Sequence, residues 1–438
     1  MIKGALTFVC RGALACAMAA SLAGCTMHAM GAPGALVQTP AGGSQQPDVL
    51  QGGGGGGFVV IHDPNNAFAL GGIAAGPDGN MWAINQNNNS VARVQMSTKL
   101  KEFVFPTATS GAWGITNGPD GNLWVTEENV YQIAKVTPAG SITEYQTPIK
   151  TGVIRYSPGD GIVTGPDNNL WFTLRDGDVA KSTTGGAMTV YALSPGGCAG
   201  QEINVGPDHN LWVSTNCSAI DKVTTGGAVT AYNIVSGDVP FYIVNGSDGN
   251  MYFSETGGYF LGKITTGGTI TEMDSHPCYV YGNRGLVAVG NQIWFVCEGT
   301  AGVNQIGRFN VSTQQFMSPL SPPRVLLDTT RTEYFAAGPD GNIWFTNDNA
   351  DIGVRVQLAI TLTPLSATIA PGGQQTITVS ETHYAGAWTA SSANTGIATV
   401  APGLTANTFT VTGVAAGKVK ITISDSKGNS AVVVITVS

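Results

Sequence analysis

The sequence predicts an all-β protein: a seven-bladed β-propeller whose N-terminal strand closes the last blade, followed by a C-terminal β-sandwich. The motif Gly-Pro-Asp-Gly-Asn-Leu-Trp at residues 118–124 recurs in seven variants, and its aromatic residue returns every 40 to 50 residues. This is the period of a propeller blade. Beyond residue 358 the motif stops, and alternating runs separated by Gly and Pro predict the strands of a sandwich.

Each repeat reads as four short strands. An apolar run before the Pro-Asp-Gly-Asn segment and an alternating run after it predict a hairpin, because Asp and Gly favour tight turns. The third strand carries one basic residue per repeat, which we assign to blade construction, and a Gly-rich turn leads to the fourth strand. The aromatic residues that mark the second strands are Trp82, Trp124, Trp171, Trp212, Tyr252, Trp294 and Trp344.

The two ends of the propeller complete one blade. The last repeat supplies only three strands, and residues 58–64 match the fourth-strand pattern that ends in proline elsewhere. An unpaired edge in the last blade would invite aggregation. We therefore expect the N-terminal strand to close the ring, which a β-sandwich with coincidental turns, the alternative, does not predict.

The N-terminus predicts export. A positively charged start and a small apolar run end in Leu-Ala-Gly before Cys25. This resembles a bacterial lipobox, so that Cys25 is expected to carry lipid and to anchor an outer-membrane lipoprotein; a plain secretory signal is the alternative. The expected segments are a signal peptide (1–24), a flexible Gly/Ala/Pro/Gln-rich tether (25–57), the propeller (58–357) and the sandwich (358–438).

Composition and cysteine count indicate which partners and which compartment to expect for the protein. Charged residues make up 11% of the chain and its net charge is −8, so nothing predicts nucleic acid as a partner. Four cysteines remain after Cys25, and an even number in an oxidising compartment predicts two disulfides. The hairpin geometry favours Cys198 with Cys217 and Cys278 with Cys297, while a metal site, the other interpretation, lacks Cys-x-x-Cys spacing.

Two family resemblances follow from these motifs. Repeats of the form Gly-Pro-Asp-Gly-Asn-Leu-Trp-Phe-Thr-Glu with an Ile-Gly-Lys/Arg-Ile strand resemble the virginiamycin B lyase family over about 58–357. Residues 358–438 resemble a bacterial Ig-like domain of group 2, on the segments 388–394, 397–400 and 411–417, with Trp388 as a core aromatic. The first resemblance implies a lyase that opens a streptogramin lactone by elimination, with Mg²⁺, a Glu-x-His pair and a second histidine near the channel.

Those histidines do not occur at the matching positions. The residues two places before each first-strand aliphatic position are Gly71, Trp113, Asp160, Gln201, Phe241, Arg284 and Glu333. An elimination near neutral pH needs a base and an acid, for which histidine is suited. The only Glu-x-His, at 381–383, falls in the sandwich and reads as a surface coincidence, and Asp274-Ser275-His276 is the nearest substitute.

The sequence therefore favours a non-catalytic recognition module without cofactors or bound metal, with Mg²⁺ relevant only to the alternative of a lyase. Aromatic and polar residues at the channel mouth are suited to a carbohydrate, peptide or other small ligand; a pore filled with side chains is the alternative. The candidate ligand-binding residues are Trp113, Asp160, Gln201, Phe241, Tyr242, Arg284 and Glu333. Carboxylates between the second and third strands could hold a cation, but without EF-hand spacing we expect them to lie in solvated loops. They are Glu127, Glu128, Asp176, Asp178, Glu255, Asp348 and Asp351.

Overall fold

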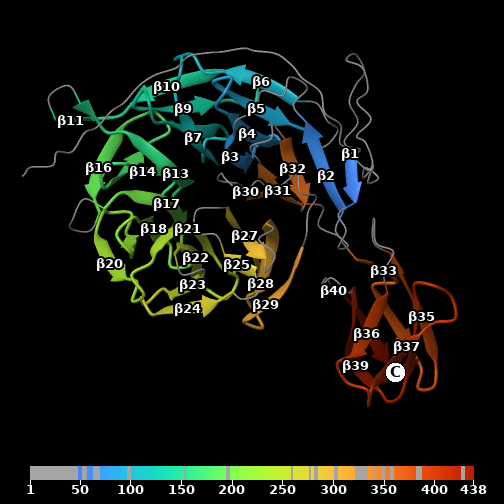
Figure 1. The fold of residues 1–438 in the computed structure, drawn as a ribbon. Helices are drawn as coiled ribbons and strands as arrows, with labels where there is room; N and C mark the ends of the chain where they lie inside the picture. Colours follow the sequence, from blue (N-terminus) through green and yellow to red (C-terminus); the bar gives the residue numbers. More distant parts are fainter. Residues whose placement is uncertain are drawn as a thin grey trace, which may run out of the picture. The chain divides into compact units, whose positions relative to one another are not determined.

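A computed structural model gives the fold of the chain (Figure 1). The described residues are 48–51, 57–62, 70–95, 100–151, 154–193, 198–257, 260–275, 278–280, 285–299, 304–320, 334–339, 342–346, 351–355, 360–380, 387–425 and 430–438. All regular elements in these ranges are β-strands. None of these ranges contains a helix long and apolar enough to cross a membrane. The predicted signal peptide and Cys25 lie outside the described residues.

Seven sheets arranged around a centre form the predicted blades (Figure 1). Blade 1 consists of β3 (Leu70–Ala75), β4 (Met81–Asn85), β5 (Ser90–Val94) and β6 (Leu100–Val104). Blade 2 consists of β7 (Ala112–Asn117), β8 (Leu123–Glu127), β9 (Gln132–Val136) and β10 (Ile142–Gln146). A small hairpin of β11 (Ile149–Thr151) and β12 (Ile154–Arg155) follows.

The next three blades repeat the four-stranded antiparallel order. Blade 3 consists of β13 (Pro158–Thr164), β14 (Leu170–Leu174), β15 (Asp178–Ser182) and β16 (Met188–Ala192). Blade 4 consists of β17 (Gly200–Val205), β18 (Leu211–Thr215), β19 (Ala219–Val223) and β20 (Val229–Asn233). Blade 5 consists of β21 (Val239–Asn245), β22 (Asn250–Thr256), β23 (Phe260–Thr265) and β24 (Ile270–Asp274).

The last two blades depart from this order. In blade 6 two strands, β25 and β26, both pair with β27. Its strands are β25 (Cys278–Val280), β26 (Leu286–Val289), β27 (Gln292–Gly299), β28 (Asn304–Asn310) and β29 (Gln315–Leu320). Blade 7 contains β30 (Phe335–Ala337), β31 (Ile343–Thr346), β32 (Asp351–Arg355), β2 (Gly57–His62) and β1 (Asp48–Gln51).

The predicted ring closure is confirmed. The N-terminal strand β2 pairs antiparallel with β32, from Phe58 opposite Arg355 to His62 opposite Asp351. The outer strand β1 then pairs with β2. Residues 48–51 were expected to belong to the flexible tether, so the structure places a strand where the sequence predicted none. The reason is local, because Asp-Val-Leu-Gln is a strand-compatible run inside a segment that is otherwise rich in Gly.

The repeated motif is a clamp between a turn and the second strand. In blade 2 the Trp124 indole nitrogen donates to Asp120 Oδ1 at 3.1 Å, and the same bond recurs in blades 1, 3 and 4 at 2.9 to 3.0 Å. Burial would raise the pKa of Asp120, but hydrogen bonds from Asn122 and Trp124 hold that pKa below its usual value. The motif begins with Gly118 because a Cβ there would collide with the Trp124 ring.

In blades 1, 3, 4 and 5 the basic residue of the third strand joins neighbouring blades, as expected for a structural role. In blade 3 the Lys181 ammonium lies over the Trp171 ring, 5.3 Å from its centroid. It lies 3.3 Å from Asp167 and donates to the carbonyl of Thr225 in the next blade at 3.1 Å. Blade 4 repeats this arrangement through Lys222.

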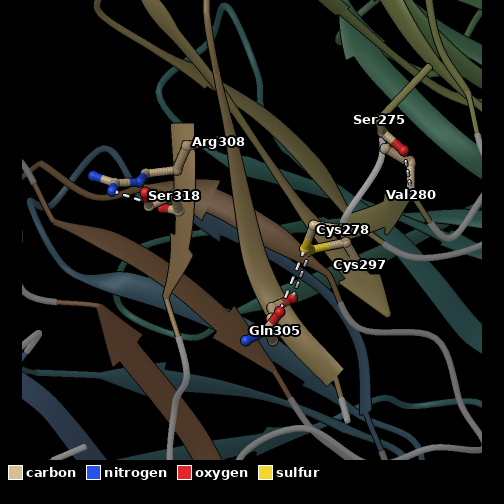
Figure 2. Close-up of a disulfide and its surroundings, with 7 residues drawn as sticks. All are labelled: Ser275, Cys278, Val280, Cys297, Gln305, Arg308 and Ser318. Atoms are coloured by element: carbon tan, nitrogen blue, oxygen red, sulfur yellow. Dashed lines mark hydrogen bonds between the residues drawn. A yellow bond between two sulfur atoms is a disulfide. The ribbon is translucent and has the colours of Figure 1, made fainter. Parts of the chain in front are cut away.

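Both predicted disulfides are present. Cys198 bonds to Cys217 beside blade 4, with Cα atoms 5.4 Å apart. Figure 2 shows the second, Cys278 to Cys297, which joins β25 to β27 across 5.3 Å between Cα atoms and lies beside Gln305 of β28. Each disulfide therefore ties the start of the first strand of a blade to the end of its second strand, as the hairpin argument predicts.

The C-terminal unit is a sandwich of two four-stranded sheets. One sheet has the order β33 (Thr361–Thr363), β35 (Gln374–Ser380), β38 (Thr408–Gly413) and β37 (Ala398–Pro402). The other has the order β34 (Ser366–Ile369), β40 (Ser430–Val437), β39 (Gly417–Asp425) and β36 (Trp388–Ser392). Their inner faces share one apolar core, and Trp388 packs against it, as predicted.

Candidate functional site

The first strands of all seven blades surround a cavity of about 190 Å³ in the channel. Glycine in the first strands of blades 1 and 2 lets neighbouring first strands approach closely around this cavity, because a Cβ on Gly114 would collide with the Asp160 carbonyl. The polar residues that line the cavity are Asp160, Glu202, Asn204, Tyr242 and Tyr334.

A repeated bulge decides which side chains face this cavity. In blade 4 the backbone amide of Glu202 donates to Ser214 Oγ of the second strand at 3.1 Å, and the strand register shifts there. Four other blades form the same bond from a first-strand amide to a Thr or Ser hydroxyl. Because a bulge interrupts the alternation of faces, the residue directly before the aliphatic position lines the cavity in blades 4, 5 and 7.

Glu202 is an acid held neutral. Burial raises its pKa to about 8, and the charge of Asp160 adds to this, while the Ile203 amide, which donates to its carboxyl at 3.2 Å, lowers it. The Glu202 carboxyl is therefore a proton donor near neutral pH.

Asp160 belongs to an ion-pair bridge on the same side of the channel. Arg175 Nη2 lies 2.9 Å from Asp160 Oδ1, and Arg175 Nε lies 2.6 Å from Glu128 Oε1. Burial raises the pKa of Asp160 and the Arg175 charge opposes that effect. Arg175 itself is 43% exposed, so the bridge contributes little to stability but fixes the two carboxylates.

Two tyrosines complete the cavity. The rings of Tyr242 and Tyr334 meet edge to face, with centroids 6.0 Å apart. Burial raises the pKa of both hydroxyls well above 10, so that both stay neutral. The Tyr242 hydroxyl is buried and has no hydrogen-bond partner among the described residues. It can therefore donate to or accept from a group that enters the cavity.

A second cavity of about 470 Å³ lies beside the connection between blades 1 and 2. Trp113 lines it together with four side-chain amides and Glu128. The amides are Gln86, Asn87, Asn89 and Asn129. Since Glu128 also contacts Arg175, the ion-pair bridge connects this cavity, called here the Trp113 cavity, to the channel cavity through Asp160.

The structure separates the predicted ligand residues. Asp160 and Tyr242 line the channel cavity and Trp113 lines the other. Gln201 and Phe241 line neither; Phe241 instead packs on Tyr242 with ring centroids 5.2 Å apart. The ligand-binding role of Gln201 and Phe241 stays a prediction; in these two blades the bulge brings the next residue, Glu202 or Tyr242, to the channel cavity. Arg284 and Glu333 lie outside the described residues.

Reasoning from sequence missed Glu202 and Tyr334, each one place after a predicted residue. The Ser or Thr two places after the second-strand aromatic is the signal that marks the bulged blades and could have found them.

Two acids expected in solvated loops are buried. Glu127 and Glu255 are 0% exposed and lie in the second strands of blades 2 and 5. The expectation was wrong because the second strand extends past its apolar residues and carries these acids into the sheet. Among the others, Asp176 pairs with Lys150 at 2.7 Å. Within the described ranges no three His, Cys, Asp or Glu side chains form a group that could hold a metal ion.

The fold and the channel define a class of seven-bladed β-propeller with an appended bacterial Ig-like domain. The chain belongs to the virginiamycin B lyase family, whose model matches residues 58–327. The model of the bacterial Ig-like domain of group 2 matches residues 358–436.

Solved structures agree. A streptogramin B lyase is 26% identical, with a TM-score of 0.60 over 68% of this chain and 96% of that one. A catalytically inactive histidine-to-alanine variant of virginiamycin B lyase from Staphylococcus aureus, with quinupristin, is 26% identical, with a TM-score of 0.59 over 68% and 98%. The WD40 propeller of Doa1, at 11% identity and a TM-score of 0.51 over 69% and 96%, shares the fold alone. None of the curated proteins matches the chain.

Proposed function

We propose that the chain is an exported, lipid-anchored recognition module that binds a carbohydrate at the mouth of the propeller channel without turnover. The Trp113 cavity carries this proposal. Its volume of about 470 Å³ falls in the range of ligand pockets, roughly 300 to 1,000 Å³, whereas the channel cavity of about 190 Å³ is smaller than that range.

The lining of the Trp113 cavity suits a neutral, hydroxyl-rich ligand. A half-buried indole ring offers an apolar face for stacking on a sugar ring. Side-chain amides donate and accept hydrogen bonds at once, as sugar hydroxyls require. The side-chain nitrogen of Gln86 donates to the Ala112 carbonyl at 3.1 Å. This bond fixes the orientation of the amide, whose oxygen can then accept a hydrogen bond from a ligand.

Replacing Trp113 should weaken carbohydrate binding. We expect Trp113→Ala to cost roughly 1 to 3 kcal/mol in affinity for a glycan identified by array, because a stacked aromatic contact is lost. Gln201→Ala is the matched control, since Gln201 lines neither cavity. The measurement is isothermal titration calorimetry. Unchanged affinity in Trp113→Ala, or an equal loss in Gln201→Ala, would place the site elsewhere.

A second function, lactone opening, is favoured by the channel cavity, where Glu202 can donate a proton near neutral pH and the neutral Tyr242 hydroxyl can donate a hydrogen bond. The channel carboxylates do not fit the Mg²⁺ that the family resemblance implies. Asp160 already pairs with Arg175, so among the described residues Glu202 is the one remaining carboxyl that could bind the ion in the channel cavity. Incubation with quinupristin, with and without Mg²⁺, and chromatography of the products tests this function. Ring opening that Glu202→Gln abolishes would overturn the non-catalytic proposal, whereas intact quinupristin supports it.

The lipid anchor is tested at Cys25. We expect a fatty-acid analogue to label the chain, and Cys25→Ala to lose both the label and membrane association, because the thiol is the acylation site of a lipobox. The two disulfides are typical of an exported protein and accord with this route. Labelling that survives Cys25→Ala would refute the anchor and leave a plain secretory signal.

A further inference from the structure

Blades 2 and 5 each carry two glutamates on one face of the sheet, one buried and one half-buried. In blade 2, Glu127 of β8 and Glu144 of β10 are close enough for the charge of Glu144 to act on Glu127. In blade 5, Glu255 of β22 and Glu272 of β24 have the same relation. Glu127 and Glu255 occupy equivalent positions, three residues after the second-strand aromatic. We call these two sets the acid pairs.

One member of each acid pair is already held by the connection that leads into the blade. The amide and hydroxyl of Thr107 donate to Glu144 at 2.9 and 2.6 Å, and the hydroxyl of Ser236 donates to Glu272. The other member is not. Both carboxyl oxygens of Glu127 and of Glu255 are buried without a hydrogen-bond partner among the described residues.

Blade 1 shows what the acid pairs lack. There the equivalent residue is Asn85, whose amide donates to Glu102 Oε1 at 2.7 Å, and Asn88 donates to the other oxygen at 3.0 Å. Both oxygens of Glu102 therefore accept hydrogen bonds from neutral side-chain amides. In blade 3 the equivalent residues are the apolar Leu174 and Val190. In blades 2 and 5 two acids occupy these equivalent positions instead.

The blade 2 pair is surrounded by further oxygens without partners. Gln132 lies directly across from Glu127 in the sheet, and its buried Oε1 has no hydrogen-bond partner in the described part of the chain. Ser110 acts on the Glu127 carboxyl from the connection, and its buried Oγ does not meet hydrogen-bond geometry with any described group. The Ser110 hydroxyl brings its own proton, but the two Glu127 oxygens and Gln132 Oε1 are acceptors without a hydrogen-bond partner among the described residues. A hard cation coordinates several such oxygens at once.

The third strand carries small residues beside the acids. The residue opposite Glu144 is Ala134, and the residue opposite Glu272 is Gly262. A Cβ on Gly262 would collide with the Phe253 ring and would lie 2.7 Å from Glu255 Oε1, so glycine accommodates both that ring and that carboxyl.

We propose that the two acid pairs are binding sites for a hard divalent cation, calcium, one ion per pair. Calcium takes six to eight oxygen ligands in flexible geometry, so that two carboxylates can be completed by neutral oxygens and water. Magnesium demands near-ideal octahedral geometry and keeps its waters, so it fits less well. In blade 2 the ion would hold the end of β8 to β10 and to the connection from blade 1. In this way the ion would fix each of the two blades to the preceding one.

The test counts ions in the full-length mature protein. After removal of metals with a chelator and equilibration with calcium, mass spectrometry of the washed protein should find two ions per chain. Glu127→Gln and Glu255→Gln should each retain one ion, and the double variant none. Glu102→Gln in blade 1 is the matched control and should retain two. Calcium should raise the melting temperature of the wild-type chain and leave that of the double variant unchanged.

A second measurement separates ion binding from folding. In chelator, Glu127→Gln should melt at or above the wild-type temperature, because its amide can donate to Glu144 as Asn85 donates to Glu102. Wild-type protein that retains no calcium and melts alike in calcium and chelator would overturn the proposal. So would two ions retained by the double variant, or retention of magnesium with exclusion of calcium.

Discussion

A chain that lacks residues 57–62 should lose the cooperative unfolding of its propeller. Strand β2 pairs with β32 over five residues, and Ile61, 3% exposed, packs in the same core as Trp344 of β31. Net backbone hydrogen bonds contribute about 0.5 to 1.5 kcal/mol each, and loss of a buried isoleucine costs about 2 to 5 kcal/mol. The sum approaches the whole stability of a typical domain, about 5 to 15 kcal/mol.

The controls locate this effect in the closing strand. A chain that begins at Asp48 keeps β1 and β2 and should melt like the full-length protein. A chain that begins at Gly57 loses β1, an outer strand that pairs only with β2, and should melt slightly lower. The measurement is differential scanning calorimetry. Equal melting temperatures for the chains that begin at Asp48 and at Asp63 would contradict the role of β2.

The sequence predicted the blades because their determinants are local. The hydrogen bond between Asp120 and Trp124 joins residues four apart, and Gly118 is required by the same indole ring. The turn and the second strand of each repeat can therefore be recognised from its own sequence. Ring closure was also predictable, because the last repeat lacks a fourth strand and the N-terminal segment supplies one strand that belongs to no other blade.

The site was predicted less well because it depends on register. A uniform alternation places Gln201 in the channel, whereas the bulge held by Ser214 brings Glu202 to the cavity instead. Tyr242, which was predicted beside Phe241, does line the cavity. The acid pairs depend on the register of the second and fourth strands together. No local pattern distinguishes a buried Glu127 from a solvated one, because what buries it is the connection from the preceding blade.

Stability in the absence of metal should fall as the pH rises from 5 to 9. Burial raises the pKa of Glu127 to about 8, and the charge of Glu144 adds to this effect. Burial likewise raises the pKa of Glu255 to about 8, with Glu272 and Asp238 adding their charges. Between the ordinary pKa of 4.5 and 8, the folded chain keeps protons that the unfolded chain has lost. The stabilisation is therefore complete below pH 4.5 and disappears as the pH passes 8.

Each of these two buried acids should lower the free energy of unfolding by an amount on the order of 4 kcal/mol between pH 5 and 9, since one unit of pKa difference corresponds to about 1.4 kcal/mol. Urea unfolding in chelator at a series of pH values measures it. The double variant Glu127→Gln and Glu255→Gln should show a much flatter profile, because its amides do not titrate, and Glu102→Gln should keep the wild-type slope. A wild-type free energy of unfolding that stays constant or rises between pH 5 and 9 would mean that these carboxyls are already ionised in the folded chain. Saturating calcium should itself flatten the wild-type profile, because an ion between the two carboxylates replaces the proton, and a profile unaffected by calcium would indicate that protons alone occupy the acid pairs.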